Sequence, residues 1–411
     1  MRKNSKTREP VRIGVVGLGL AGAAMIPAIQ AHPNFKLVAA ADLNATLRKR
    51  FAESSGCRVH GDAESLMGSE DIEAVYIASP HQFHKEHACL ATRSGKHVIV
   101  EKPMALTLAD CDSMIETAER HRMALIVGHT HSFDPAIAAV HRLVRSGELG
   151  RPSMLSMWNY TDFLYRPRRP EELDTSRGGG ILYNQIPHQV DIARLLSCSE
   201  VISVRAMSDR LDAMRPTEGC CMAFLGFENG MAATLTYSGY DRFDIDELHD
   251  WVGEGGQPKA PRHGETKRAL RALEGDRERW SRTNDYGYGG ARKFAPSEGE
   301  QWSQPHFGIF VMTCERGDIR QSRDGITVYG DDGVREIAVS NSNGRPGRAE
   351  VLDELHNAII RGVKPVHDGR FGRGTVATCL AILESSRSGG EVWLGARCAN
   401  ARFRSNIAGQ E

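Results

Sequence analysis

The stretch Val11-Arg-Ile-Gly-Val-Val-Gly17-Leu-Gly19-Leu-Ala-Gly22 decides the fold of the first part of this chain. A short apolar run precedes the three glycines, an alanine-rich segment follows them, and Asp42 ends the next apolar run. In such a turn the first glycine permits a sharp bend, the second lets a pyrophosphate approach the backbone, and the third lets the helix pack on the strand. The N-terminus of that helix then faces the phosphates. We therefore expect a dinucleotide to be bound by Gly17, Leu18, Gly19, Leu20, Ala21, Gly22 and Asp42.

Short apolar runs alternate with helical stretches as far as residue 130. This alternation predicts a parallel sheet covered by helices, a Rossmann domain over residues 11–130, after a flexible tail at residues 1–10. The expected helices include Leu43–Glu53 and Leu106–Arg122. The expected strands are Arg12–Val16, Leu37–Ala41, Ala74–Ala78, His97–Val100 and Ala124–Val127.

The pattern changes in the second part, residues 131–411, for which we expect an α+β domain with an open, mostly antiparallel sheet. Turn dipeptides typical of hairpins occur at Asn229-Gly230, Asp324-Gly325 and Asp332-Gly333. The segment near residues 251–304 is rich in Gly, Arg, Lys and Glu, and it is expected to be a surface insertion with one helix at Arg268–Trp280. The other expected helices are Ser132–Ser146, Gln185–Leu196, Ala349–Arg361 and Thr375–Ser388.

Composition limits the possible partners. The 411 residues carry 52 basic and 52 acidic side chains, so bulk charge favours neither a nucleic-acid nor a membrane partner. Nine cysteines without a C-x-x-C pair, and a basic start without an apolar core, are typical of a cytoplasmic protein with reduced thiols. No H-E-x-x-H spacing or similar pattern occurs among the 16 histidines, so we expect no metal.

Two segments at expected strand ends carry polar side chains. Ligands bind outside the carboxyl ends of the strands in an open parallel sheet, so Ser79, Pro80, His81 and His84 should border the cofactor. Glu101 and Lys102 follow the next strand, beside the expected nicotinamide. Burial and a cationic ring would lower the pKa of the lysine toward a value useful for proton exchange with a hydroxyl; an ion-paired surface lysine is the alternative.

A glycine run at residues 178–180 precedes a helix that carries Asn184, Gln185, His188 and Asp191. Asn184 and His188 are four residues apart and therefore share one helical face. Such a face can offer hydrogen bonds to a hydroxylated substrate, although an isolated histidine is more often part of a core.

Together, these pieces resemble the Gfo/Idh/MocA family of oxidoreductases from about Val11 to Leu394. The resemblance implies that Lys102 is the catalytic lysine, that His188 is its partner, that the Lys102-Pro103 peptide is cis, and that the protein is a homo-oligomer, a dimer or a tetramer. The family often has Asp where this chain has Asn184. Because an amide cannot take up a proton, we expect Lys102 and His188 to carry it.

The stretch from Asn159 to Asp174 gives a narrower resemblance, to family members that oxidise cyclic cis-dihydrodiols. The substrate that it implies is phthalate 4,5-cis-dihydrodiol, which bears two carboxylates. Arginine grips a carboxylate with two parallel hydrogen bonds, although a Pro/Arg-rich loop can also simply be solvated. The expected substrate-binding residues are His129, His131, Tyr165, Arg166, Arg168, Arg169, Asn184, Gln185 and His188.

The sequence therefore predicts a dehydrogenase that uses NAD and oxidises a ring hydroxyl of a small molecule. Asp42 favours NAD over NADP, because a carboxylate accepts from a ribose 2′-hydroxyl and repels a 2′-phosphate; Arg48, farther along, does not reverse this expectation. A sugar or inositol dehydrogenase is the first alternative. A non-catalytic dinucleotide-binding regulator is the second, and the presence of both Lys102 and His188 disfavours it.

Overall fold

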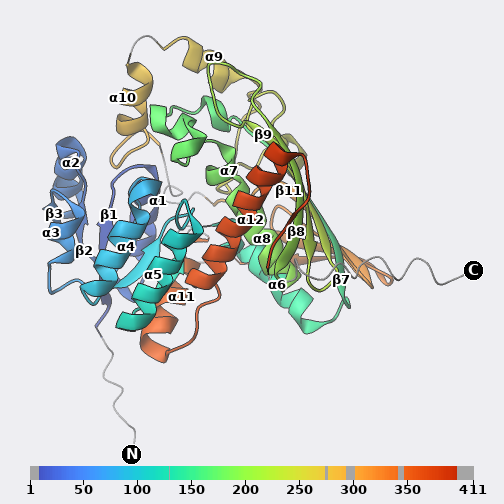
Figure 1. Ribbon diagram of the computed structural model, residues 1–411, viewed down its shortest axis with the longest axis horizontal. Helices are drawn as coiled ribbons and strands as arrows, with labels where there is room; N and C mark the ends of the chain where they lie inside the picture. Colours follow the sequence, from blue (N-terminus) through green and yellow to red (C-terminus); the bar gives the residue numbers. More distant parts are fainter. Residues whose placement is uncertain (1–8, 129, 274–275, 293–300, 341–346, 396–411) are drawn as a thin grey trace, which may run out of the picture.

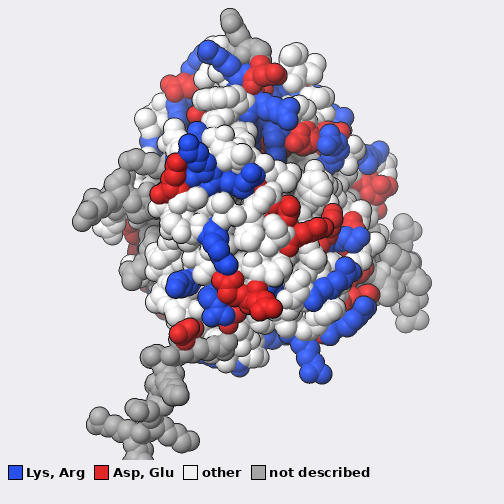
Figure 2. Space-filling view, turned by 90° about the vertical axis from the view of Figure 1, so that its left-hand side faces the viewer, with Lys and Arg blue, Asp and Glu red and all other residues white. Residues whose placement is uncertain are grey.

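The structure is a computed structural model, and it describes residues 9–128, 130–273, 276–292, 301–340 and 347–395. Two sheets form its framework, and Figure 1 shows them side by side with helices between them. Basic and acidic side chains are interspersed on the face of the molecule that Figure 2 displays. None of the helices in the described ranges is long and apolar enough to cross a bilayer.

The first sheet has the strand order β3-β2-β1-β4-β5-β6, and all its strands are parallel. Helices cover the sheet, so strands such as β4 are buried along their whole length and read as continuous apolar runs. The expected Rossmann arrangement is confirmed. The strands are β1 (Val11–Val16), β2 (Phe35–Ala41), β3 (Arg58–His60), β4 (Ala74–Ile77), β5 (His97–Val100) and β6 (Leu125–Val127).

One strand of this sheet, β3, was not expected from the sequence. It has three residues, and Arg58 and Val59 in it are exposed, so no apolar pattern marks it. The helices follow the prediction more closely. For example, α2 begins at Ala45 because the Asn44 side chain accepts from the backbone N–H groups of Thr46 and Leu47. The helices are α1 (Leu20–Ala31), α2 (Ala45–Ser55), α3 (Ala63–Met67), α4 (His84–Arg93) and α5 (Leu108–His121).

The second sheet is mostly antiparallel, as expected, and has the order β14-β13-β12-β11-β7-β10-β9-β8-β15. The central pair β7 and β10 is parallel. The predicted turn dipeptides all lie at turns between paired neighbours, β9–β10, β12–β13 and β13–β14. The strands are β7 (Pro152–Tyr160), β8 (Val201–Asp209), β9 (Cys220–Phe227), β10 (Ala232–Ser238), β11 (Ile309–Cys314), β12 (Gly317–Gln321), β13 (Gly325–Gly330), β14 (Gly333–Ala338) and β15 (Val392–Trp393).

One face of this sheet is covered by helices, and they lie toward the first sheet in Figure 1. The long helix α12 lies between α5 and β8, so it contacts both halves. It begins at Gly369, six residues before the predicted start, because the Asp368 side chain accepts from the Phe371 backbone N–H. The helices are α6 (Pro135–Ser146), α7 (Ile181–Asn184), α8 (Ile186–Ser197) and α12 (Gly369–Ser388).

Helix α11 (Arg348–Arg361) returns to the first sheet, although it lies within the expected second domain. It packs on α1, and its Val351, Leu352 and Leu355 share an apolar cluster with residues of β1 and β2. In α12, Val376 belongs to the apolar cluster of the first sheet and Ile382 to that of the second. The last two long helices therefore hold the two halves together.

The described residues of the segment 251–304 contact both halves: Thr266, for example, donates to Asp162 of the second half at 2.7 Å, and Tyr288 reaches the first half. The single helix expected at Arg268–Trp280 is wrong: the described residues form α9 (Glu265–Arg271) and α10 (Arg277–Asn284). Beyond α10, the Tyr288 backbone N–H donates to the Leu18 carbonyl at 2.9 Å. The ring of Tyr288 packs edge-on against Phe51 of α2. The segment thus lies over the glycine turn, as the position of α10 above α2 in Figure 1 shows.

Candidate functional site

The glycine turn between β1 and α1 is closely packed except at Gly19. Gly17 has φ +97°, and a Cβ there would lie 2.5 Å from the Ala78 carbonyl oxygen, while a Cβ at Gly22 would lie 1.9 Å from that of Gly17. Nothing lies within 4 Å of the Cβ position at Gly19. Gly19 also precedes α1 without a side-chain cap, so the first N–H groups of the helix, from Leu20 onward, remain available to an anion. These features fit a dinucleotide pyrophosphate.

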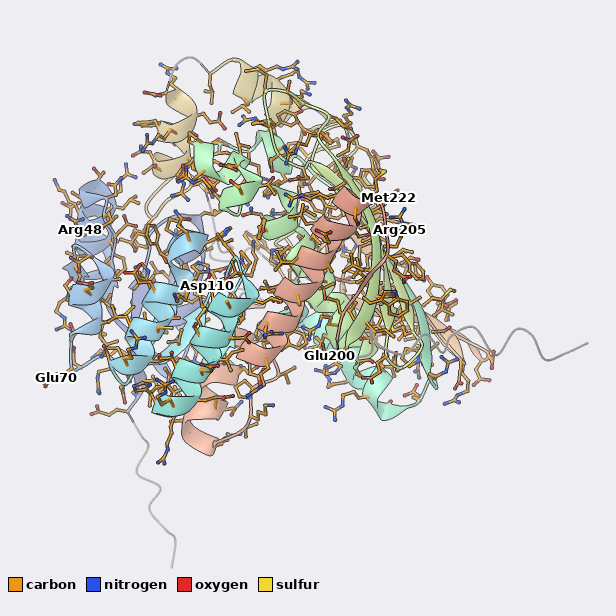
Figure 3. All side chains as sticks on the ribbon, in the orientation of Figure 1. Arg48, Glu70, Asp110, Glu200, Arg205 and Met222 are labelled. Atoms are coloured by element: carbon orange, nitrogen blue, oxygen red, sulfur yellow. The ribbon has the colours of Figure 1, made fainter. Side chains whose placement is uncertain are left out.

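Asp42 lies at the end of β2, beside this turn. Its carboxylate accepts from the backbone N–H groups of Leu18 and Asn44, both at 2.7 Å. Arg48, labelled in Figure 3, donates to the Asp42 carbonyl at 2.6 Å. The carboxylate is therefore fixed next to the glycine turn, where the remaining lone pairs of its oxygens are positioned for ribose hydroxyls.

The loop after β4 lies next to the site, and two of its histidines connect neighbouring segments. His84 is completely buried, and its ring nitrogens lie 2.9 Å from the carbonyl oxygens of Ser79 and Pro103. This histidine therefore joins the two strand-end loops and does not present its side chain to a cofactor, contrary to expectation. His81 lies 3.1 Å from the Gly178 carbonyl, and burial lowers its pKa to about 3. It links the first half to the glycine run of the second.

Lys102 occupies the predicted place at the end of β5, and the Lys102-Pro103 peptide is cis. Its Nζ donates to the Asn184 carbonyl at 2.7 Å. Burial lowers the pKa of the ammonium to about 8, and the charges of Arg168 and Arg282 act in the same direction, while Glu101 and Glu254 oppose them. An amine with this pKa can exchange a proton near neutral pH.

Glu101 supports Lys102 from behind. One carboxylate oxygen accepts from the Tyr76 hydroxyl, and the other accepts from the Lys102 backbone N–H at 3.2 Å. Because both oxygens face the interior of the first half, Glu101 positions the loop and supplies negative charge rather than a contact with a ligand.

The polar residues that follow the glycine run, Asn184, Gln185 and His188, have different hydrogen-bond partners. The Asn184 side chain donates to the carbonyls of Gly178 and Gly180, so it fixes the glycine run. Gln185 accepts from the Tyr237 hydroxyl at 3.0 Å. His188 is buried, and among the described residues its Nδ1 has no hydrogen-bond partner.

His188 is neutral in this environment. Burial holds its pKa well below the usual value, and the charges of Lys102 and His131 act in the same direction. Its ring packs against Phe307 at a centroid distance of 4.7 Å and edge-on against His131 at 5.0 Å. A neutral imidazole next to Lys102 can accept a hydrogen bond from a substrate hydroxyl or donate one to it.

Five side chains of alternating charge form a chain beside these groups. Asp162 accepts from Arg166 Nε at 2.7 Å, Arg166 lies 3.4 Å from one oxygen of Glu254, and the other oxygen lies 3.4 Å from Nε2 of His131. Nδ1 of His131 lies 2.6 Å from Asp134. Against the effect of burial, the two carboxylates raise the pKa of His131 to about 9, so this histidine is charged. His129 lies outside the described residues.

The arginines of the predicted clamp are separated by the fold. Arg166 belongs to the alternating chain, whereas Arg168 and Arg169 share the carboxylate of Glu172 with Arg282, which donates to it at 2.6 and 3.1 Å. Burial lowers the pKa of Arg168 to about 9, although Glu172 opposes the shift. Arg169 also lies 3.4 Å from Glu171, so among the described residues three guanidinium groups share two carboxylates, which leaves one positive charge in excess.

Tyr165 is not brought to this cluster. Its hydroxyl donates to Asp212 at 2.6 Å, and Lys267 lies 4.4 Å from the centre of its ring. The Tyr165 hydroxyl is therefore engaged by Asp212, and its expected contact with substrate stays a prediction.

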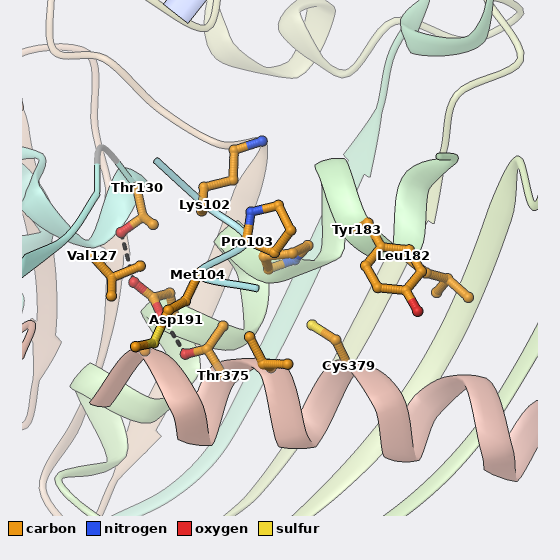
Figure 4. Close-up of a pocket in the computed structure, with 13 residues that line it drawn as sticks. Lys102, Pro103, Met104, Val127, Thr130, Leu182, Tyr183, Asp191, Thr375 and Cys379 are labelled. Atoms are coloured by element: carbon orange, nitrogen blue, oxygen red, sulfur yellow. Dashed lines mark hydrogen bonds between the residues drawn. The ribbon is translucent and has the colours of Figure 1, made fainter. Parts of the chain in front are cut away.

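A small apolar cavity of about 10 Å³ lies under the Lys102-Pro103 loop, between that loop and α12 (Figure 4). The Lys102 side chain points away from it. At its edge the buried Asp191 accepts from the hydroxyls of Thr130 and Thr375 at 2.6 and 2.5 Å. This cavity is too small for a substrate, and the hydrogen bonds of Asp191 join the two halves below the site.

Sequence reasoning missed several residues of the site. Glu254 and Arg282 come from the segment expected to be a surface insertion, and Tyr237 and Phe307 come from the second sheet and the residues before β11. No local pattern identifies them. Within the described ranges, no three His, Cys, Asp or Glu side chains gather closely enough to hold a metal ion.

Comparisons with known proteins identify the family and support the fold. The sequence model of the oxidoreductase family with an NAD-binding Rossmann fold, GFO_IDH_MocA, matches residues 11–129, and that of the GFO/IDH/MocA C-terminal domain matches residues 137–253. The chain is 42% identical to 1-carboxy-3-chloro-3,4-dihydroxycyclohexa-1,5-diene dehydrogenase of Comamonas testosteroni, over 92% of this chain and 95% of that one.

Two further relatives show how widely the similarity extends. A crystal structure described as a dehydrogenase from Bordetella bronchiseptica RB50 is 47% identical, has a TM-score of 0.89, and is matched over 94% of this chain and 100% of that one. Inositol 2-dehydrogenase 2 of Saccharopolyspora erythraea is 31% identical over 60% of this chain and 72% of its own length.

Proposed function

The chain belongs to the Gfo/Idh/MocA family of NAD-binding oxidoreductases, and we propose that it oxidises a carboxylate-bearing cyclic cis-dihydrodiol to the corresponding catechol. The specific substrate that we propose is phthalate 4,5-cis-dihydrodiol, with 4,5-dihydroxyphthalate as the product. The identity to the Comamonas enzyme, whose name describes a carboxylated ring diol, supports the substrate class.

Proton transfer falls to Lys102 in this proposal. Its amine, with a pKa of about 8, accepts the proton of the hydroxyl that is oxidised, and the neutral His188 holds that hydroxyl in place. NAD, held at the glycine turn, would supply the hydride acceptor. The resulting hydroxy-ketone tautomerises to a catechol, so aromatisation favours oxidation.

The observation that carries the carboxylate assignment is the cluster around Glu172. Arg168, Arg169 and Arg282 all pair with this carboxylate, and Arg169 also reaches Glu171 at 3.4 Å, so among the described residues one of the three positive charges stays unbalanced. The pKa of the buried Arg168 is lowered to about 9. Positive charge that the protein does not balance favours an anionic group on the ligand. Arg166 is less suited to this role, because Asp162 and Glu254 already neutralise it.

We propose NAD rather than NADP as the cofactor. The Asp42 carboxylate, fixed beside the glycine turn, would accept from a 2′-hydroxyl and repel a 2′-phosphate. Arg48 reaches the backbone of Asp42 rather than extending past it. A preference for NADP in paired kinetic assays would contradict this assignment.

The test is NADH formation at 340 nm with phthalate 4,5-cis-dihydrodiol, a monocarboxylated cis-dihydrodiol, myo-inositol and glucose as substrates. The proposal expects fast turnover of one or both carboxylated diols. Turnover of the uncharged polyols alone would favour the inositol or sugar dehydrogenase, the alternative that similarity to inositol dehydrogenases supports. Binding of NAD without turnover of any substrate would favour a regulator.

We also propose that the chain forms a homo-oligomer through the outer face of the second sheet. Large side chains are exposed there on adjacent strands: the register aligns Trp158, Thr236, Met222 and Met207 in one row across β7, β10, β9 and β8. Figure 3 labels Met222 and Arg205 on this face. The 3₁₀ helix Ile245–His249 borders this row, because its Ile245 and Leu248 line a hollow together with Trp158, Thr236 and Met222. The rest of the exposed apolar surface would be stabilised if a second copy buried it.

A further inference from the structure

Glu254 places a carboxylate in the site from a segment that the sequence marks only as polar. Its backbone lies in a tight loop: the Gly253 N–H donates to the Gln257 carbonyl at 2.8 Å, and the Glu254 carbonyl accepts from the His306 N–H at 3.2 Å. The loop therefore presents the side chain in a defined position. Its two oxygens lie between His131 and Arg166, each at 3.4 Å.

This carboxylate lies next to the paired rings of His131 and His188. It is 3.4 Å from His131, whose ring packs against that of His188 at 5.0 Å, and its negative charge also acts on Lys102. The Glu254 side chain keeps 35% of its surface open, so it is accessible to a ligand. Glu101, the other carboxylate that acts on Lys102, turns both oxygens to the interior.

Glu254 is an acceptor and not an acid. His131 and Arg166 hold its pKa well below the usual value, although burial acts in the opposite direction. It therefore stays ionised and accepts hydrogen bonds. Asn184 offers only a neutral amide oxygen, which is a weaker acceptor than a carboxylate, and its nitrogen donates to the glycine run.

A vicinal diol presents two hydroxyl donors to the site. When Lys102 takes the proton of one hydroxyl, the neighbouring hydroxyl still needs an acceptor. We propose that Glu254 accepts a hydrogen bond from the hydroxyl that is not oxidised, and so selects diols over substrates with a single hydroxyl. This inference rests on the proposed function, whose substrate it deepens.

The expected effect is one of selectivity. A site built to pair with a substrate hydroxyl discriminates strongly against an analogue that lacks it, and hydrogen bonds to charged groups are among the stronger ones. We expect Glu254→Gln to lower kcat/KM for the diol by about 10- to 100-fold more than for a matched single-hydroxyl substrate.

The experiment measures kcat/KM of the wild type and Glu254→Gln with a carboxylated cis-dihydrodiol and with the corresponding cyclohexenol carboxylate. Glu247→Gln is the matched control, since Glu247 is a nearby carboxylate that also pairs with a histidine, His263 at 3.0 Å, and is exposed. Glu247→Gln should leave kcat/KM unchanged for both substrates. Glu254→Asp, which keeps the charge with a shorter reach, should retain part of the preference and serves if the glutamine variant fails to fold.

A fall in the ratio of diol to single-hydroxyl kcat/KM in Glu254→Gln supports the inference. An unchanged ratio overturns it, whether both rates fall together, as for a structural role, or neither falls. If the wild type oxidises no diol at all, the proposed function and this inference both fail. Wild-type turnover of the diol with an unchanged ratio in the variant leaves the proposed function standing and removes only the role of Glu254.

Discussion

Replacing Lys102 by methionine separates the catalytic role of this lysine from a structural one. At pH 7 an amine with a pKa of about 8 is about one-tenth unprotonated, whereas an ordinary lysine is about one part in 3,000 unprotonated. The environment of Lys102 therefore gives about 300 times more free base. Lys102→Met removes that base, and we expect kcat to fall by about 10²- to 10⁴-fold.

The same substitution should make the protein more stable. The folded-state pKa of about 8 lies below the ordinary lysine value of 10.5. Burying the charged amine therefore opposes folding fully below pH 8, and this penalty disappears as the pH rises toward 10.5. Burial of the charged amine costs at most about 3 kcal/mol of folding free energy, which Lys102→Met recovers. The variant also loses the hydrogen bond to the Asn184 carbonyl, which reduces this gain by about 1 kcal/mol. We expect a higher Tm at pH 7, with a smaller gain at pH 10.

Three measurements check this reasoning: NADH formation at 340 nm, thermal melting at the two pH values, and calorimetric titration with NAD, whose affinity should remain. In the wild type, kcat/KM for oxidation should rise about tenfold per pH unit and level off near pH 8, because only the free amine accepts a proton. Turnover by Lys102→Met within tenfold of the wild type would refute the assignment of Lys102 as the base.

Three further changes test other parts of the structure. Glu101→Gln should move the midpoint of the pH–rate profile below that of the wild type, because this carboxylate favours charged Lys102; a midpoint that rises would contradict this. Gly19→Ala should weaken NAD binding about tenfold or more without lowering Tm, since its Cβ would enter the open space proposed for the pyrophosphate. Gly22→Ala should instead lower Tm, because its Cβ would lie 1.9 Å from a backbone oxygen. The same NAD affinity and the same Tm for Gly19→Ala and Gly22→Ala would contradict this distinction. Met222→Glu should dissociate the proposed oligomer in light scattering, and a monomeric wild type would refute that interface.

The site was only partly predictable from the sequence. Lys102 and the glycine turn were placed correctly because both follow strands of a sheet whose ligand-binding edge is known in advance. Arg166, Arg168 and Arg169 lie in one short stretch, and nothing local distinguishes them. Each has an acidic partner only three or four residues away, Asp162 or Glu172, and their roles differ because of charges distant in sequence, namely Glu254 beside Arg166 and Arg282 on Glu172.

The fold shows the same division. The parallel first sheet and the hairpins of the second sheet follow from short-range patterns, whereas β3 is too short and polar to leave such a pattern. The apolar face of α11 predicts burial but not the sheet that it covers, and only the tertiary structure assigns it to the first. In the same way, the turn dipeptides predict an antiparallel sheet but not the parallel pair β7 and β10 at its centre.

The sequence by itself determined the dinucleotide turn, the parallel and antiparallel sheets, and Lys102 at a strand end. Each depends on interactions between residues close in the chain, such as backbone turns, caps and alternating burial. The tertiary structure decided which charges meet: the lowered pKa of Lys102, the chain from Asp162 to Asp134, and the carboxylate of Glu254. Electrostatic pairing and burial depend on distance in space, and the segments that supply these groups are far apart in sequence.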